Sequence, residues 1–167
     1  VNEDIVESTG KGRKIVIPFD QKLTKNSENL LSKLNPEIEV SSSNFDVISF
    51  KDASNVFAKR YSANLLLTKP LSKSKTEEVI RQAVADFRER EYYRHDELRK
   101  RWQKTKAHVV WVFVYRTVED SAHTNWICRS LWIDETLPKR HRPLELKGKD
   151  IGQGIIVDWS DRYEMLK

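Results

Sequence analysis

The sequence predicts an α+β fold, in which a mostly antiparallel sheet is packed by two or three helices. The segments 108–117 and 126–134 are rich in β-branched and aromatic residues, and the polar stretch between them predicts a central hairpin. The segment from about 75–103 contains neither glycine nor proline and has helical apolar spacing. We therefore expect an N-terminal arm over residues 1–12 and a single α+β domain over residues 13–167.

Composition excludes several classes of protein. Hydrophobic residues make up 38% of the 167 residues and aromatic residues 10%, which is too rich for a wholly disordered chain. The longest apolar run, Val109–Tyr115, is far shorter than the roughly 18 residues that span a bilayer, so we expect no membrane partner. Cys128 is the only cysteine, which excludes a disulfide scaffold. We expect part of a larger intracellular, cytoplasmic protein, whose oligomeric state the sequence leaves open.

The first quarter of the chain carries weaker signals. Residues 13–19 predict a strand, and Ser27 predicts the cap of a short helix. Residues 37–40 and 45–50 predict two further short strands, joined by a turn of serine and asparagine.

A helix is predicted next, capped by Asp52 or Ser54. The basis is the spacing of Phe57, Tyr61 and Leu65, which fall at positions i, i+4 and i+8 and so share one face of a helix.

The long segment that follows predicts one helix over about 75–103. Residues 74–77 match the capping box, in which a hydroxyl and a carboxylate satisfy the first free N–H groups. At 1.5 Å per residue such a helix is about 40 Å long. Its first half carries an apolar stripe made of Ile80, Ala83, Val84 and Phe87.

The segment 108–117 carries the strongest strand signal. Apolar residues occupy both of its faces, which is typical of a central strand covered on both sides. We therefore expect Trp111 and Phe113 to be buried. Residues 126–134 predict the returning strand, and residues 152–159 a last one.

The second half of the long predicted helix is basic. Arg94 and Arg101 lie among tyrosines and a tryptophan, and this combination suits phosphate contacts with base stacking. Acidic residues are interleaved, so the alternative is a solvated helix laced with ion pairs. A further alternative is a protein contact made by the Leu98–Trp102 end.

A second basic signal lies between Pro138 and Pro143. Its four residues are uninterrupted by any acidic residue, and the flanking prolines predict a loop. Such a loop can hold phosphates by charge alone, although an exposed connection that is basic by chance is the alternative. The residues are Lys139, Arg140, His141 and Arg142.

A third pattern points to an enzyme. Asp134 ends a predicted strand, and the Glu145-Leu146-Lys147 triplet follows at a point where the next strand could begin. This spacing resembles the PD-(D/E)xK nuclease pattern, with Ile133 in place of its proline. The resemblance implies that Asp134 and Glu145 hold Mg²⁺ and that Lys147 helps to activate water.

The pattern as a whole favours a non-catalytic binding domain that contacts nucleic-acid phosphates, with no cofactor and no metal. Its excess of positive charge is modest, because the formal net charge is +5. The alternatives are a metal-dependent nuclease and a protein–protein interaction domain. The residues expected to contact nucleic acid are Arg94, Arg101, Lys139, Arg140, His141 and Arg142.

Overall fold

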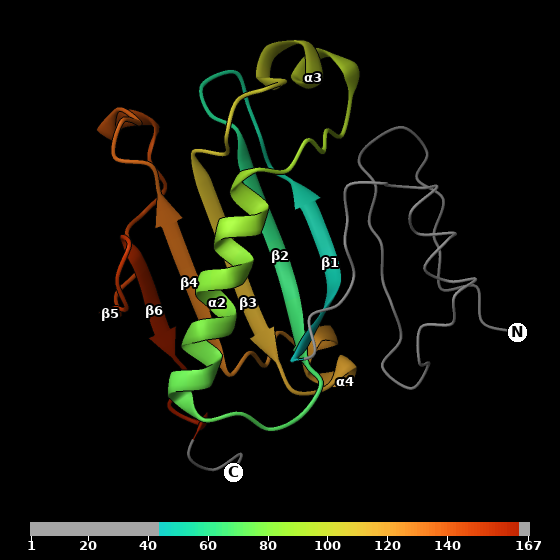
Figure 1. Cartoon of the computed structure of the whole chain (residues 1–167), viewed down its shortest axis with the longest axis vertical. Coiled ribbons are helices and arrows are strands. Elements are labelled where there is room, and N and C mark those ends of the chain that lie inside the picture. Colours follow the sequence, from blue (N-terminus) through green and yellow to red (C-terminus); the bar gives the residue numbers. More distant parts are fainter. Residues whose placement is uncertain (1–43, 164–167) are drawn as a thin grey trace, which may run out of the picture.

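A computed structural model describes residues 44–163. They form one six-stranded sheet with the strand order β1-β2-β3-β4-β6-β5 (Figure 1). This is the predicted α+β class, with the predicted hairpin at its centre. The strands are β1 (Phe45–Asp52), β2 (Arg60–Leu67), β3 (Val109–Tyr115), β4 (Cys128–Ile133), β5 (Lys149–Asp150) and β6 (Ile155–Trp159).

Every pairing in this sheet is antiparallel except that of β2 with β3. A parallel pair needs a crossover connection, and here residues 68–108 supply it. This connection contains α2 (Lys73–Arg88) and α3 (Asp96–Trp102). The short helix α4 (Val118–Ala122) follows β3, and the 3-10 helix η1 (Lys139–His141) follows β4.

The main core lies between α2 and one face of the sheet. Strand alternation turns every second residue of β3 toward α2, beginning at Val110. Ile80 and Val84 of α2 are buried against this face, as the apolar stripe predicted. The N-cap of α2 is Ser72, two residues before the cap that the sequence suggested. Its hydroxyl accepts a hydrogen bond from the Lys75 N–H.

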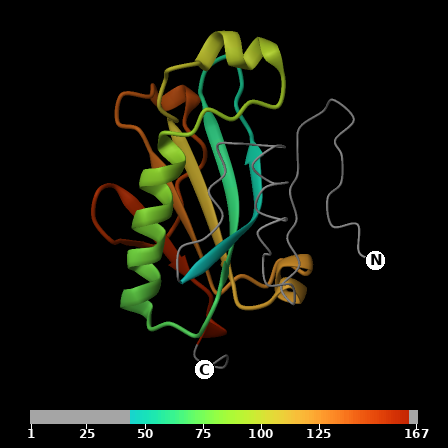
Figure 2. The same ribbon diagram turned by 45° about the vertical axis from the view of Figure 1, so that its right-hand side comes forward.

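Among residues 44–163, the opposite face of the sheet is covered only at its two ends. At one end Val109 packs with Leu137 in the connection after β4, and at the other Tyr115 packs with Val118 of α4. Figure 2 shows α2 and α4 on opposite sides of the sheet. Between these ends Trp111 and Phe113 are only partly buried, so the prediction of full burial was wrong. We call this surface the open face.

The helix predicted from Asp52 or Ser54 is a strand instead. Residues four and eight positions apart share a face in a helix, but they also share a face in a strand, because both spacings are even. The intervening Ala63 is buried on the same face as Tyr61 and Leu65, which identifies the period as two.

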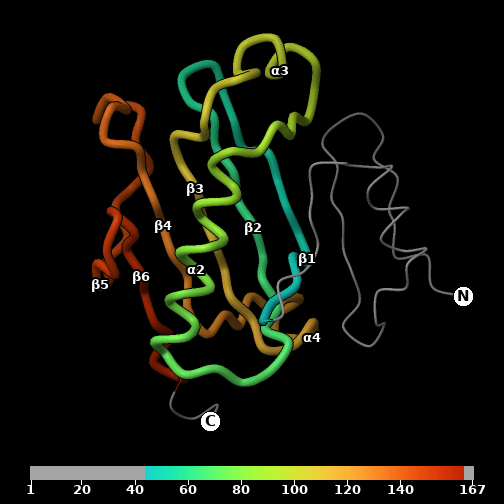
Figure 3. The backbone as a smooth tube through the Cα atoms, viewed as in Figure 1, coloured from blue at the N-terminus to red at the C-terminus, as the bar shows by residue number. Residues whose placement is uncertain are grey.

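The single long helix predicted over 75–103 is also wrong, because residues 89–95 separate α2 from α3 (Figure 3). Tertiary contacts replace the helical hydrogen bonds there. The Tyr61 hydroxyl accepts from the Tyr92 N–H and lies 2.9 and 2.8 Å from the carbonyl oxygens of Arg90 and Tyr92. The Tyr92 ring packs against Phe50, 5.5 Å between centroids. Asp52 accepts from the Arg94 N–H.

Replacing Tyr61 with phenylalanine tests whether its hydroxyl compensates for the helical hydrogen bonds that are absent between α2 and α3. The variant keeps the ring but removes the partner of the buried backbone groups of Tyr92 and of the partly buried Arg90 carbonyl, so we expect a loss of about 1–3 kcal/mol in the free energy of unfolding. Urea denaturation measures it. Tyr115→Phe is the control, because Tyr115 is also buried but its hydroxyl bonds no other described residue. Equal losses in the two variants would contradict this account.

Candidate nucleic-acid interface

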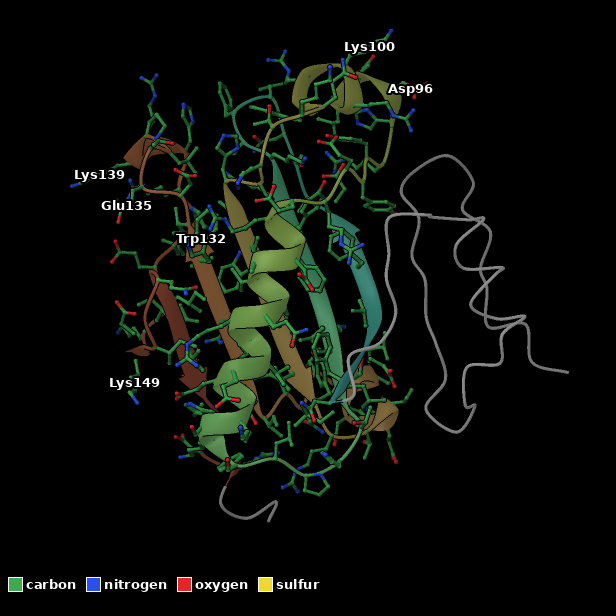
Figure 4. All side chains as sticks on the ribbon, viewed as in Figure 1. Asp96, Lys100, Trp132, Glu135, Lys139 and Lys149 are labelled. Atoms are coloured by element: carbon green, nitrogen blue, oxygen red, sulfur yellow. The ribbon has the colours of Figure 1, made fainter. Side chains whose placement is uncertain are left out.

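Three connections meet at one end of the sheet, because β1 and β4 end there and β2 and β3 begin there. They are the β1–β2 loop (residues 53–59), the segment 89–108 with α3, and the segment 134–148 with η1. Both basic segments singled out in the sequence therefore lie at the same end, as Figures 1 and 4 show. We call this region the basic end.

The β1–β2 loop binds α3 on one side. Its carbonyl groups are the acceptors: the Trp102 indole N–H donates to Asn55 at 2.8 Å, and the Arg94 guanidinium donates to Ser54 at 2.7 Å. Arg101 makes a longer bond to Val56, at 3.4 Å. Leu98 is buried. The Leu98–Trp102 stripe therefore holds α3 to the domain.

The same loop contacts η1 on its other side. The Phe57 ring stacks on the His141 imidazole with 4.3 Å between centroids and 8° between planes. The Arg60 guanidinium, at the start of β2, donates to the His141 carbonyl oxygen. Phe57 is nevertheless 57% exposed. The two basic segments are thus joined through a loop that also presents an aromatic ring to solvent.

A buried lysine anchors the loop from beneath. The Lys59 side chain is fully buried, and its ammonium donates to the Thr105 carbonyl oxygen at 2.6 Å and to the Tyr93 hydroxyl at 3.1 Å. The Glu91 carboxylate lies 3.6 Å away and accepts from the Tyr93 hydroxyl. A buried ammonium needs such partners to offset its loss of hydration. Lys59 is therefore held for structure and is not available to a ligand.

Lys106 pairs with Glu89 at 2.7 Å, whereas the other exposed cations of the basic end have no acidic partner among the described residues. Figure 4 shows Lys100 on α3 and Lys139 beyond β4 projecting from the same end of the domain, with Asp96 and Glu135 on the same two segments. The exposed acidic residues here are Glu89, Asp96, Glu97, Glu135 and Glu145. The exposed cations without an acidic partner among the described residues are Arg99, Lys100, Arg101, Lys104, Lys139, Arg140 and Lys147.

The predicted binding residues divide into two groups. Lys139, Arg140 and Arg101 are exposed. Arg142 is half-buried and donates to the carbonyl oxygens of Leu137 and Glu135, both at 2.7 Å, so it closes its own loop. Arg94 is likewise committed to the β1–β2 loop. His141 accepts from Arg140 at 3.0 Å and is covered on one ring face by Phe57.

The residues of the nuclease-like pattern are arranged differently from the expectation. Asp134 follows β4 and accepts from the N–H and hydroxyl of Thr136, at 2.8 and 2.6 Å; the hydroxyl bond is the main reason why the pKa of its carboxyl is lowered. Glu145 and Lys147 are exposed and lie outside any strand, because β5 begins only at Lys149. Within residues 44–163, no three His, Cys, Asp or Glu side chains are grouped to hold a metal.

Two further features bear on chemistry. Burial raises the pKa of the Cys128 thiol well above its ordinary value, so the group stays protonated at neutral pH and is a poor nucleophile. None of the helices in the described part of the chain has the length and apolar character to cross a bilayer.

His108 links two of the connections and was not identified from sequence. The Nδ1 of its imidazole accepts from the Lys59 backbone N–H at 2.9 Å, while the His108 backbone N–H donates to the Lys59 carbonyl oxygen at 2.8 Å. Burial lowers the pKa of its imidazole, with Lys59 and Arg60 acting in the same direction and Asp134 opposing them. No sequence signal identified Phe57, Lys59 or His108 as residues of the basic end, because their partners lie far away in the chain.

No protein-family model, no curated protein and no solved structure matches this chain. Its function is therefore inferred from its own residues and their geometry.

The lowered pKa of His108 makes stability depend on pH. The unfolded chain binds the His108 proton more readily than the folded domain does, so stability falls as pH drops below the unfolded value of about 6.5. Protonation also removes the acceptor for the Lys59 N–H. Thermal melts between pH 7.5 and 5 measure this. His108→Asn keeps an acceptor but cannot titrate, so its melting temperature should change less over that range.

His123→Asn is the matched control, because His123 is exposed and its side chain bonds no other described residue. It should retain the wild-type pH profile. A flat wild-type profile, or an unchanged profile in His108→Asn, would contradict the role of His108.

Proposed function

We propose that this domain binds nucleic acid by holding backbone phosphates at the basic end. The observation that supports this is the meeting of α3 and η1, which are far apart in sequence, on either side of the β1–β2 loop. Lysine and arginine side chains bind phosphate through charge and hydrogen bonds, and each contact releases condensed counterions. The cations without acidic partners, chiefly Lys100, Arg101, Lys139 and Arg140, carry the proposal.

Binding of this kind is largely independent of sequence. Phosphates carry no base information, and the exposed cations sit on short segments without a recognition helix. The exposed ring of Phe57 in the loop adds contact area but no base code. We therefore expect similar affinity for unrelated oligonucleotides of equal length.

A salt titration tests the proposal with labelled duplex and single-stranded oligonucleotides. Log affinity should fall linearly with log salt, and the double variant Lys139→Ala/Arg140→Ala should flatten the slope by about 1.8 on duplex or about 1.4 on single strands, if each residue neutralises one phosphate. Arg142 stays in place, because its removal would disturb the loop itself.

The control removes two positive charges from the opposite end of the sheet. Lys69→Ala/Arg162→Ala changes the net charge equally, and both residues are exposed. It should leave the slope unchanged. Binding too weak to measure at low salt, or equal flattening in both variants, would overturn the proposal. Mg²⁺-dependent cutting of the oligonucleotide that Glu145→Gln abolishes would replace it with the nuclease alternative.

A further inference from the structure

The middle of the open face presents a pair of aromatic rings. Trp111 and Phe113 are two positions apart on β3 and project from the same face. Their ring centroids are 6.1 Å apart and their planes are inclined by only 13°. Both side chains are partly exposed, although β3 lies in the centre of the sheet. The strand thus places two nearly parallel rings where solvent reaches them.

Polar side chains border these rings on the neighbouring strands. In the register of the sheet, Ser62 pairs with Trp111 and Asn64 with Phe113 across β2, and Arg129 pairs with Phe113 across β4. The side chains of Ser62 and Asn64 are partly exposed and bond no other described residue. An apolar partner surface would leave these polar groups unsatisfied, whereas the edge of a base offers them donors and acceptors.

The ring pair is continuous with the basic end. Trp111 packs against the cluster that contains Leu137 and Leu146, the apolar residues on either side of η1. Arg60 lies on the same face at the start of β2 and reaches the His141 carbonyl oxygen. Arg129 adds less charge, because it pairs with Asp158 at 2.9 Å. A nucleic-acid strand whose phosphates are bound at η1 would therefore have its bases within reach of the open face.

We propose that Trp111 and Phe113 form a stacking surface for unpaired bases, so that the preferred ligand is single-stranded nucleic acid. This inference rests on the function proposed above. In a duplex the bases are stacked on one another and their faces are closed to the protein, whereas the bases of a single strand are free to stack on aromatic rings. Ser62 and Asn64 lie where they can bond the base edges.

Fluorescence anisotropy with the full chain tests this, using labelled single-stranded DNA, single-stranded RNA and duplex DNA of equal length. Trp111→Leu and Phe113→Leu keep apolar bulk but remove the ring, and each should weaken single-strand binding about 5- to 150-fold. Duplex affinity and the salt slope should stay unchanged, because the phosphate contacts remain. If the leucine variants lose more affinity for RNA than for DNA, or the reverse, the difference identifies the type of nucleic acid that the open face prefers.

Two further variants separate stacking from folding. Trp111→Phe keeps an aromatic ring and should retain most of the affinity, while losing the tryptophan fluorescence quenching that stacked bases cause. Trp159→Leu removes a ring that packs on the α2 side of the sheet, against Tyr163, and should leave binding unchanged.

The outcomes also separate this inference from the function on which it rests. Full single-strand affinity in both leucine variants, with a slope that still depends on Lys139 and Arg140, would overturn the stacking surface and leave phosphate binding in place. Absence of binding to every oligonucleotide at low salt would overturn both. Full quenching of fluorescence in Trp111→Phe would also contradict contact between bases and Trp111.

Discussion

The parallel pairing of β2 with β3 is the constraint on which the arrangement of this domain depends. Two neighbouring strands that run in the same direction oblige the chain to return from the end of one to the start of the other. Here α2 makes that return across one face of the sheet and supplies the main core. The crossover must then reach the start of β3, and α3 lies in this last part of the connection. The position of α3 beside the β1–β2 loop thus follows from strand direction.

The break between α2 and α3 follows from the same geometry. A single helix continued from α2 would run past the sheet, whereas β3 begins beside β2. Side chains of β1 and β2 hydrogen-bond the backbone groups that no longer bond within a helix: Tyr61 bonds Tyr92, and Asp52 bonds Arg94. Phe50 packs against the Tyr92 ring. Helix propensity amounts to less than 1 kcal/mol per residue, so buried contacts of this kind outweigh it. The absence of glycine and proline from the segment permits a helix but does not impose one.

The sequence predicts those parts of the fold in which the periodic pattern has one reading. The seven consecutive apolar residues of β3, with valine at alternate positions, are typical of a strand and too few for a buried helix. Shorter apolar runs mark β4 and β6. The spacing of Phe57, Tyr61 and Leu65 has two readings, and only the packing of Ala63 against the core decides between them. Of the arginines and lysines singled out by charge, Lys139 and Arg140 are exposed. The guanidinium groups of Arg94 and Arg142 instead bond loop carbonyls, and no local sequence signal identifies which arginine closes a loop.

The two faces of the sheet differ in what their apolar residues do. On the α2 side, the valines of β3 are fully buried and serve the core alone. On the open face the same strand carries larger rings that no helix within residues 44–163 covers. They lie beside serine and asparagine side chains that bond no other described residue. Burying both rings beneath a helix would need apolar neighbours on β2, where Ser62 and Asn64 stand instead. Alternate residues of β3 therefore have different roles: those on one face build the core, and those on the other form the surface. The same holds for β2, where Ala63 faces the core between Ser62 and Asn64 on the open face.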